Sequence, residues 1–90
     1  IPMPSFEARH DIYKIHSKRM NLDSSVNIEE LAARSENSTG ADIKAICTEA
    51  GMFAIRDNRD IVSMQDFEKA IAKVLAEDAE KAMESGPMFA

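Results

Sequence analysis

The stretch that decides the fold is STGADIKAICTEAG, residues 38–51. It opens with a helix-start signal, because Thr39 can cap a helix through its hydroxyl and Asp42 completes a capping-box-like pair. Gly40 and Ala41 lie between them, where the backbone N–H groups of a helix have no intrahelical partner. Since no bulky side chain covers this backbone, another molecule can approach it closely. The pattern predicts that this helix start is either a tight packing point or a place that contacts a ligand.

The apolar spacing predicts four helices and no sheet. They are expected at about residues 6–20, in a short stretch after Asn27, at about residues 40–56, and from the cap at Ser63 to about Ser85. Residues 61–62 are expected to be extended and to make a short β contact. The fold class is therefore predicted to be all-α.

Two of these helices carry specific expectations for the core. In the first helix, Ala8, Ile12 and Ile15 recur at helical spacing, so this row is predicted to face the core. In the third helix, Cys47 falls in the apolar stripe and is predicted to be a small core residue. Gly51 lies inside the same helix, where glycine is unfavourable, and this predicts close packing against a neighbour.

The composition restricts the class of protein. Ninety residues form one small domain at most, and the net charge of −5 argues against nucleic acid as a partner. The apolar runs are too short for a membrane span. A lone cysteine is typical of a reducing, intracellular compartment. Because no leader is visible and the chain begins at Ile1, we expect a piece of a longer protein.

No catalytic group can be assembled from the sequence. His10 and His16 are six residues apart on one predicted helix, so they point to different faces and cannot share a metal. The phosphate-binding pattern GxxxxGK[ST] does not occur in the 90 residues. The chain is therefore not expected to be an enzyme on its own.

Several segments together resemble the small helical lid domain of proteasomal AAA+ ATPases, the family of the archaeal proteasome-activating nucleotidases and the eukaryotic regulatory-particle ATPases. The resemblance covers about residues 1–75 and depends on the order and spacing of the motifs. The matching segments are IPMP (1–4), EAR (7–9), KIHSKRMNL (14–22), STGAD (38–42), ICTEAGMFAIR (46–56), DF (66–67) and KA (69–70).

The resemblance implies a four-helix lid domain over residues 1–85, followed by a flexible tail at residues 86–90. In that family the lid closes over ATP, bound with Mg in the full-length protein, and couples the nucleotide state to substrate unfolding and translocation. The family pattern places His16 beside the ribose and adenine, and Gly40 and Ala41 in close backbone contact with the nucleotide. The isolated lid is expected to bind nucleotide weakly or not at all, because it supplies only half of the site.

The family's C-terminal tail docks on the proteasome core particle. Here the tail ends in Met88, Phe89 and Ala90, with phenylalanine where tyrosine is usual, so docking is implied and the gate-opening hydroxyl is missing. The implied partners are the chain's own large AAA+ domain, neighbouring subunits of a hexamer, the core-particle α-ring and assembly chaperones, with no nucleic acid and no membrane. The implied location is the cytoplasm, and also the nucleus if the source is eukaryotic.

Two other interpretations stay open at this point. The chain could be a stand-alone helical module that binds other proteins, such as chaperones, or the lid of a related non-proteasomal AAA+ unfoldase. The sequence leaves the archaeal or eukaryotic source and the identity of the subunit undecided.

Overall fold

The computed structural model describes residues 2–85, and it places most of them in helices. In this part of the chain the helices are α1 (Phe6–Ser17), α2 (Ile28–Arg34), α3 (Gly40–Arg56) and α4 (Met64–Ser85). The predicted all-α class is confirmed. The bounds of α3 match the prediction, α1 ends earlier than predicted, and α4 stays helical to Ser85.

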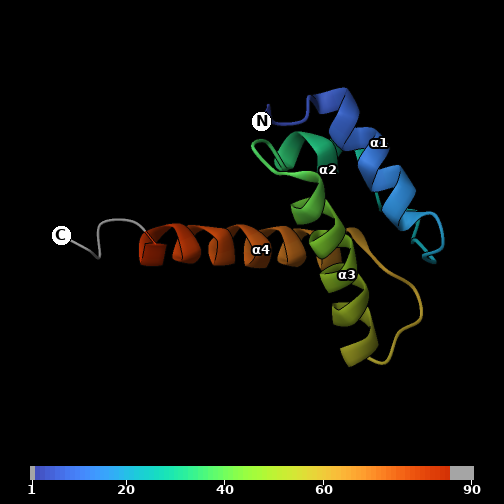
Figure 1. Ribbon diagram of the computed structural model, residues 1–90. Helices are drawn as coiled ribbons and strands as arrows, with labels where there is room; N and C mark the ends of the chain where they lie inside the picture. Colours follow the sequence, from blue (N-terminus) through green and yellow to red (C-terminus); the bar gives the residue numbers. More distant parts are fainter. Residues whose placement is uncertain (1, 86–90) are drawn as a thin grey trace.

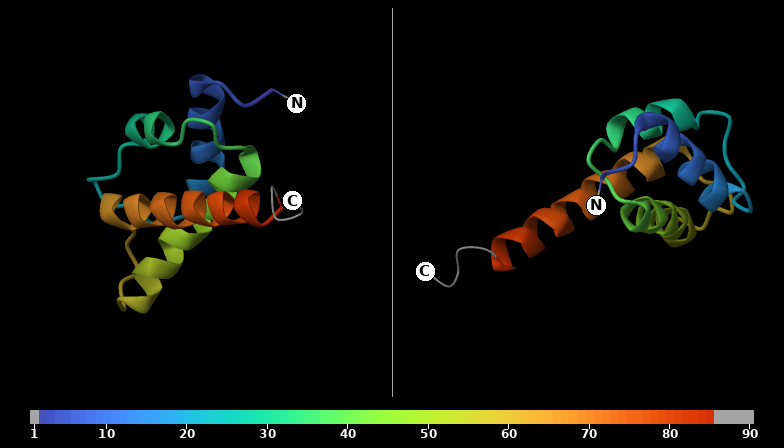
Figure 2. Two further views of the ribbon diagram at one scale, coloured as in Figure 1. Left: turned by 90° about the vertical axis from the view of Figure 1, so that its left-hand side faces the viewer. Right: turned by 45° about the horizontal axis from the view of Figure 1, so that its top comes forward.

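Helix α3 is the centre of the fold, because it packs against both α1 and α4. In Figure 1, α3 descends through the middle, α1 and α2 cover its upper part, and α4 crosses it. The second half of α4 continues beyond the other helices, as Figure 1 and the right-hand view of Figure 2 show. This half is mostly exposed up to residue 83, as its Ala, Glu and Lys content predicted.

The core lies where one face of α3 packs against α1 and α4, and α2 packs in turn against α1 and α4. The buried face of α3 is the one that the sequence predicts, and Cys47 lies on this face as expected. Phe67 and Val74 close the core from α4, while Leu31 closes it from α2. The buried apolar residues are Tyr13, Leu31, Ala32, Ile43, Ile46, Cys47, Ala50, Ala54, Val62, Phe67, Ala70, Ile71 and Val74.

The predicted core-facing row of α1 is wrong at Ile15, whose surface is 67% exposed. Ile12 packs against the core, but the fully buried row is Arg9, Tyr13 and Ser17. This row turns inward because its polar groups find partners: Arg9 Nε donates to the Ala32 carbonyl at 2.8 Å. The Tyr13 hydroxyl is hydrogen-bonded to the hydroxyl of Ser35.

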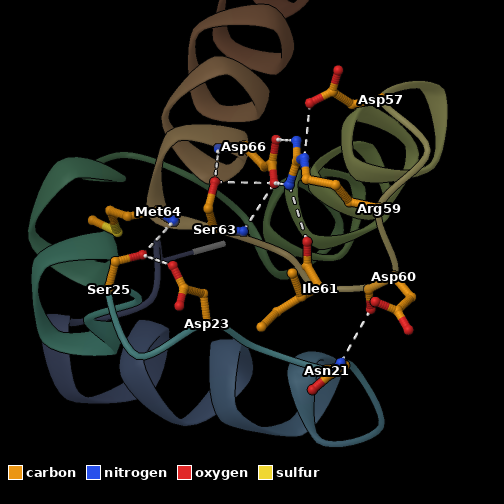
Figure 3. Close-up of polar contacts among 10 residues, drawn as sticks. All are labelled: Asn21, Asp23, Ser25, Asp57, Arg59, Asp60, Ile61, Ser63, Met64 and Asp66. Carbon is orange, nitrogen blue, oxygen red and sulfur yellow. Dashed lines mark hydrogen bonds and ion pairs between the residues drawn. The ribbon is translucent and has the colours of Figure 1, made fainter.

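The predicted extended contact at residues 61–62 is present as a single parallel bridge between Leu22 and Val62. Val62 donates its N–H to the Asn21 carbonyl, and its own carbonyl accepts from Asp23, each at 2.8 Å. Figure 3 shows the polar contacts that surround this bridge, including that of Asn21 with Asp60. The loop after α1 is therefore tied to the loop before α4.

Candidate functional site: the exposed face of α3

The predicted capping box at the start of α3 is present. The Thr39 hydroxyl accepts a hydrogen bond from the Asp42 N–H at 3.0 Å, and the Asp42 carboxylate accepts from the Thr39 N–H at 2.9 Å. Burial works to raise the pKa of Asp42, but these bonds, a bond from Asp78 and the charge of Lys81 outweigh it and lower the pKa. The bond to Asp42 raises the pKa of Asp78, which therefore holds a proton more readily.

Lack of room for a side chain does not explain why residues 40 and 51 of α3 are glycines. A Cβ added to Gly40 would lie 3.8 Å from Ile12 Cδ1, and one added to Gly51 would lie 3.8 Å from Met20 Cε. Both distances are ordinary van der Waals contacts, so the close packing predicted at Gly51 is not found. At Gly40 the tight-packing alternative loses its support in the same way. Gly40 itself is half-buried, and a side chain at this position would point toward Ile12 of α1.

A hollow of about 360 Å³ lies between the end of α1 and the exposed face of α3. His16 reaches it from α1, where its side chain is half-buried. Lys44 and Thr48 supply polar groups from α3, and the rest of the lining is largely apolar. The lining residues are His16, Met20, Lys44, Cys47, Thr48, Gly51, Met52 and Ile55.

A second hollow, of about 300 Å³, lies on the other side of the same α3 face. Its lining includes Ala41 and, from α4, Val74 and Glu77. Lys44 and Thr48 line both hollows, so the two adjoin along α3.

The structure thus brings two of the predicted site residues, His16 and Ala41, to adjoining hollows. Gly40 is the residue before Ala41, but it lines neither hollow. Sequence reasoning missed Lys44 and Thr48, although their four-residue spacing places them on one helix face with Gly40. The role of all three predicted residues in nucleotide contact remains a prediction.

The second histidine of α1 lies elsewhere. His10 lines a separate hollow of about 250 Å³ beside Phe6 and Glu29, away from the hollow that His16 lines. Within residues 2–85, no three His, Cys, Asp or Glu side chains gather closely enough to hold a metal ion. Met88, Phe89 and Ala90 lie outside the described residues.

None of the helices between residues 2 and 85 is long and apolar enough to cross a membrane. Burial raises the pKa of the Cys47 thiol, which lines the first hollow, to about 12, so the protonated form is favoured at neutral pH.

Comparison with known proteins identifies the domain family of this chain. Residues 25–69 match the model of the AAA+ lid domain, and the chain belongs to this family. The resemblance predicted from the sequence motifs is therefore confirmed.

The most similar relatives include two archaeal proteins and one plant protein. The chain is 52% identical over 91 aligned positions to the proteasome-activating nucleotidase of Methanocella arvoryzae, covering all of this chain and 22% of that protein. It is 59% identical over 75 residues to the proteasome-activating nucleotidase of Archaeoglobus fulgidus, covering 83% of this chain and 19% of that protein. It is 49% identical over 82 residues to 26S proteasome regulatory subunit 8 homolog B of Arabidopsis thaliana, covering 91% of this chain and 20% of that protein. The chain thus spans about a fifth of the length of these relatives.

Proposed function

We propose that this chain is the nucleotide-responsive lid of a proteasome-associated AAA+ unfoldase subunit. The observation that carries the proposal is the placement of His16 and Ala41 at adjoining hollows on α3, in a chain whose relatives are named nucleotidases and proteasome subunits. Hydrolysis of ATP, with Mg, belongs in this proposal to the much larger remainder of the subunit. The lid contributes binding groups and movement.

The start of α3 is suited to a polar ligand. The capping box takes up the N–H groups of Thr39 and Asp42, which leaves those of Gly40 and Ala41 for a ligand. Lys44 adds a cationic side chain one turn further along, and His16 adds a ring at the far side of the first hollow. In the proposed mechanism, closure of the lid brings these groups to ATP that is held by the large domain. The resulting rigid-body movement drives substrate unfolding and translocation in a hexamer.

The test places a leucine at Gly40 in the full-length subunit. Gly40→Leu adds bulk at the start of α3 beside Ile12, so the Kd for ATP is expected to rise several-fold while circular dichroism shows an intact helical domain. Ala33→Leu is the matched control, because Ala33 is exposed on α2 and lines none of the hollows described above. If Gly40→Leu unfolds the lid, or leaves ATP binding unchanged, the proposed contact is wrong.

The same proposal assigns docking on the core-particle α-ring to Met88, Phe89 and Ala90, which lie outside the described residues. Their apolar side chains suit an apolar pocket on that ring. Replacing Met88 and Phe89 by alanine in the full-length hexamer is expected to abolish binding to the core particle. Unchanged stimulation of peptidase activity in this variant would rule out the tail assignment. Assembly chaperones are further proposed partners, and the proposed location is the cytoplasm, or also the nucleus in a eukaryote.

A further inference from the structure

The chain enters the lid through a stiff segment, residues 2–5, which we call the N-terminal arm. Pro2 and Pro4 fix their own φ angles, and Pro4 also forces Met3 away from the helical region. Ser5 then caps α1 in an extended conformation, with φ −70° and ψ 173°, and its hydroxyl accepts from the Ala8 N–H. The two prolines and the Ser5 cap therefore restrict the backbone of the arm, and its direction depends on how its last residues are held.

Arg9 holds the end of this arm. Its guanidinium reaches back past the helix start, and Nη1 donates to the Pro4 carbonyl at 3.0 Å. The same guanidinium donates through Nε to the Ala32 carbonyl at 2.8 Å, in the last turn of α2. One planar group thus joins the arm to a helix that lies 23 residues further along the chain.

The surroundings of Arg9 are unusual for a charged residue. Its surface is only 7% exposed, and no carboxylate among residues 2–85 forms an ion pair with it. Its charge instead faces the C-terminal end of α2, where the helix dipole is negative. A buried arginine held only by backbone carbonyls fixes geometry, because its two donors are set at a defined angle in one plane.

We propose that Arg9 is a positioning residue that fixes the direction of the N-terminal arm against α2, so that the arm and the lid move as one body. This proposal rests on the proposed function, and it adds that the arm is the connection between the lid and the large ATPase domain. A rotation of the lid is then transmitted through the arm and is not absorbed at its end. Any bending is displaced to the chain before the arm.

The experiment measures the distance between spin labels on Met3 and Ala33, both exposed, in the full-length subunit. Labels are introduced as Met3→Cys and Ala33→Cys, other accessible cysteines are replaced, and labelled subunits are diluted with unlabelled ones. Cys47 stays in place because it is buried. A second pair of labels, on Ala33 and Lys69, reports on α2 against α4 within the lid.

The test variant is Arg9→Lys, which keeps the charge but has one point-like donor group that cannot span both carbonyls in the fixed geometry of a guanidinium. The expected width of the Met3–Ala33 distance distribution is at least twofold greater than in the unchanged protein, while the Ala33–Lys69 distribution stays the same. Arg19→Lys, the same change at an exposed residue just after α1, is expected to alter neither. An unchanged Met3–Ala33 width would overturn the proposal. Broadening of both pairs would also overturn it, because Arg9 would then only hold the lid together.

The mechanical part is tested on the same variants by the amount of substrate unfolded per ATP hydrolysed. In Arg9→Lys this ratio is expected to fall threefold or more with the Kd for ATP unchanged. An unchanged ratio would overturn the transmission of movement through the arm. If the unchanged full-length protein binds no ATP, the proposed function fails, and the distance measurements still decide the role of Arg9.

Discussion

The Asp66 carboxylate lies 2.9 Å from both terminal guanidinium nitrogens of Arg59. Asp66 is 2% exposed, and it also accepts hydrogen bonds from the N–H and hydroxyl of Ser63, at 2.9 and 3.1 Å. Arg59 extends the network to Asp57 at 2.8 Å and to the Ile61 carbonyl, as Figure 3 shows. This network closes the turn between α3 and α4, so it sets how the two helices cross.

The Arg59–Asp66 pair predicts a specific loss of stability in acid. Hydrogen bonding to Arg59, aided by Ser63, lowers the pKa of Asp66 to about 2 despite its burial. A lowered pKa in the folded state stabilises the fold above the ordinary pKa near 4, and this contribution disappears as the pH falls from about 4 to about 2. We expect Asp66→Asn to reduce the free energy of unfolding by about 2 kcal/mol at pH 7, and to flatten its dependence on pH in that range. Urea unfolding across pH measures this. Glu36→Gln, at an exposed carboxylate, is the control, and an equal effect there would contradict the assignment.

Tyr13 is the single tyrosine of the chain, so its ionisation can be followed by absorbance without interference. Burial raises its pKa to about 12, although the bond to Ser35 works in the opposite direction. The fold therefore favours the neutral phenol, and this stabilisation is present below pH 10 and is lost between about pH 10 and 12. We expect phenolate absorbance to rise only with loss of helicity, and near pH 10 in denaturant. Ionisation near pH 10 in a protein that is still helical would contradict the burial of Tyr13.

Gly51 offers a test of packing at the centre of α3. Since a Cβ there would meet Met20 Cε only at 3.8 Å, Gly51→Ala gains helix propensity without a clash. The expected change is a rise in the free energy of unfolding of about 0.5–1 kcal/mol, measured by denaturant unfolding. A decrease of similar size would show that close packing governs this position.

The thiol of Cys47 is expected to react very slowly with thiol reagents in the native protein. It is buried and its pKa is raised to about 12, so thiolate is scarce at neutral pH. Reaction with a thiol reagent is expected to occur at least a hundredfold more slowly than in the denatured chain, and to track unfolding as denaturant is added. Rapid labelling of the folded chain would show that the first hollow opens to its floor.

Local rules predicted much of this fold from the sequence. The capping box of Thr39 and Asp42 and the buried face of α3 depend on residues close together in the chain, so their spacing is sufficient. The row of Arg9 and Tyr13 was missed because a charged and a hydroxyl side chain are usually expected outside. The burial of Arg9 depends on the carbonyls of Pro4 and Ala32, and that of Tyr13 depends on Ser35. The spacing of apolar residues along α1 does not reveal these partners.

The candidate site was predictable in part for the same reason. The bare start of α3 is visible in the sequence, whereas its connection to His16 came only with the family resemblance. Lys44 and Thr48 line the two hollows only because α1 and α4 pack on either side of α3, and the sequence alone does not reveal that packing. The sequence did not predict the ion pair between Arg59 and Asp66, although it did predict a helix cap at Ser63.

The central claim is that the α3 face with His16 contacts ATP in the full-length subunit. The most direct measurement compares the Kd for ATP in the His16→Ala and His10→Ala variants of that subunit. The two histidines share α1 but line different hollows, so each change removes the same ring from a different place. The account predicts that His16→Ala weakens ATP binding several-fold and that His10→Ala leaves it unchanged. Equal affinities in both variants and the unchanged protein would contradict it.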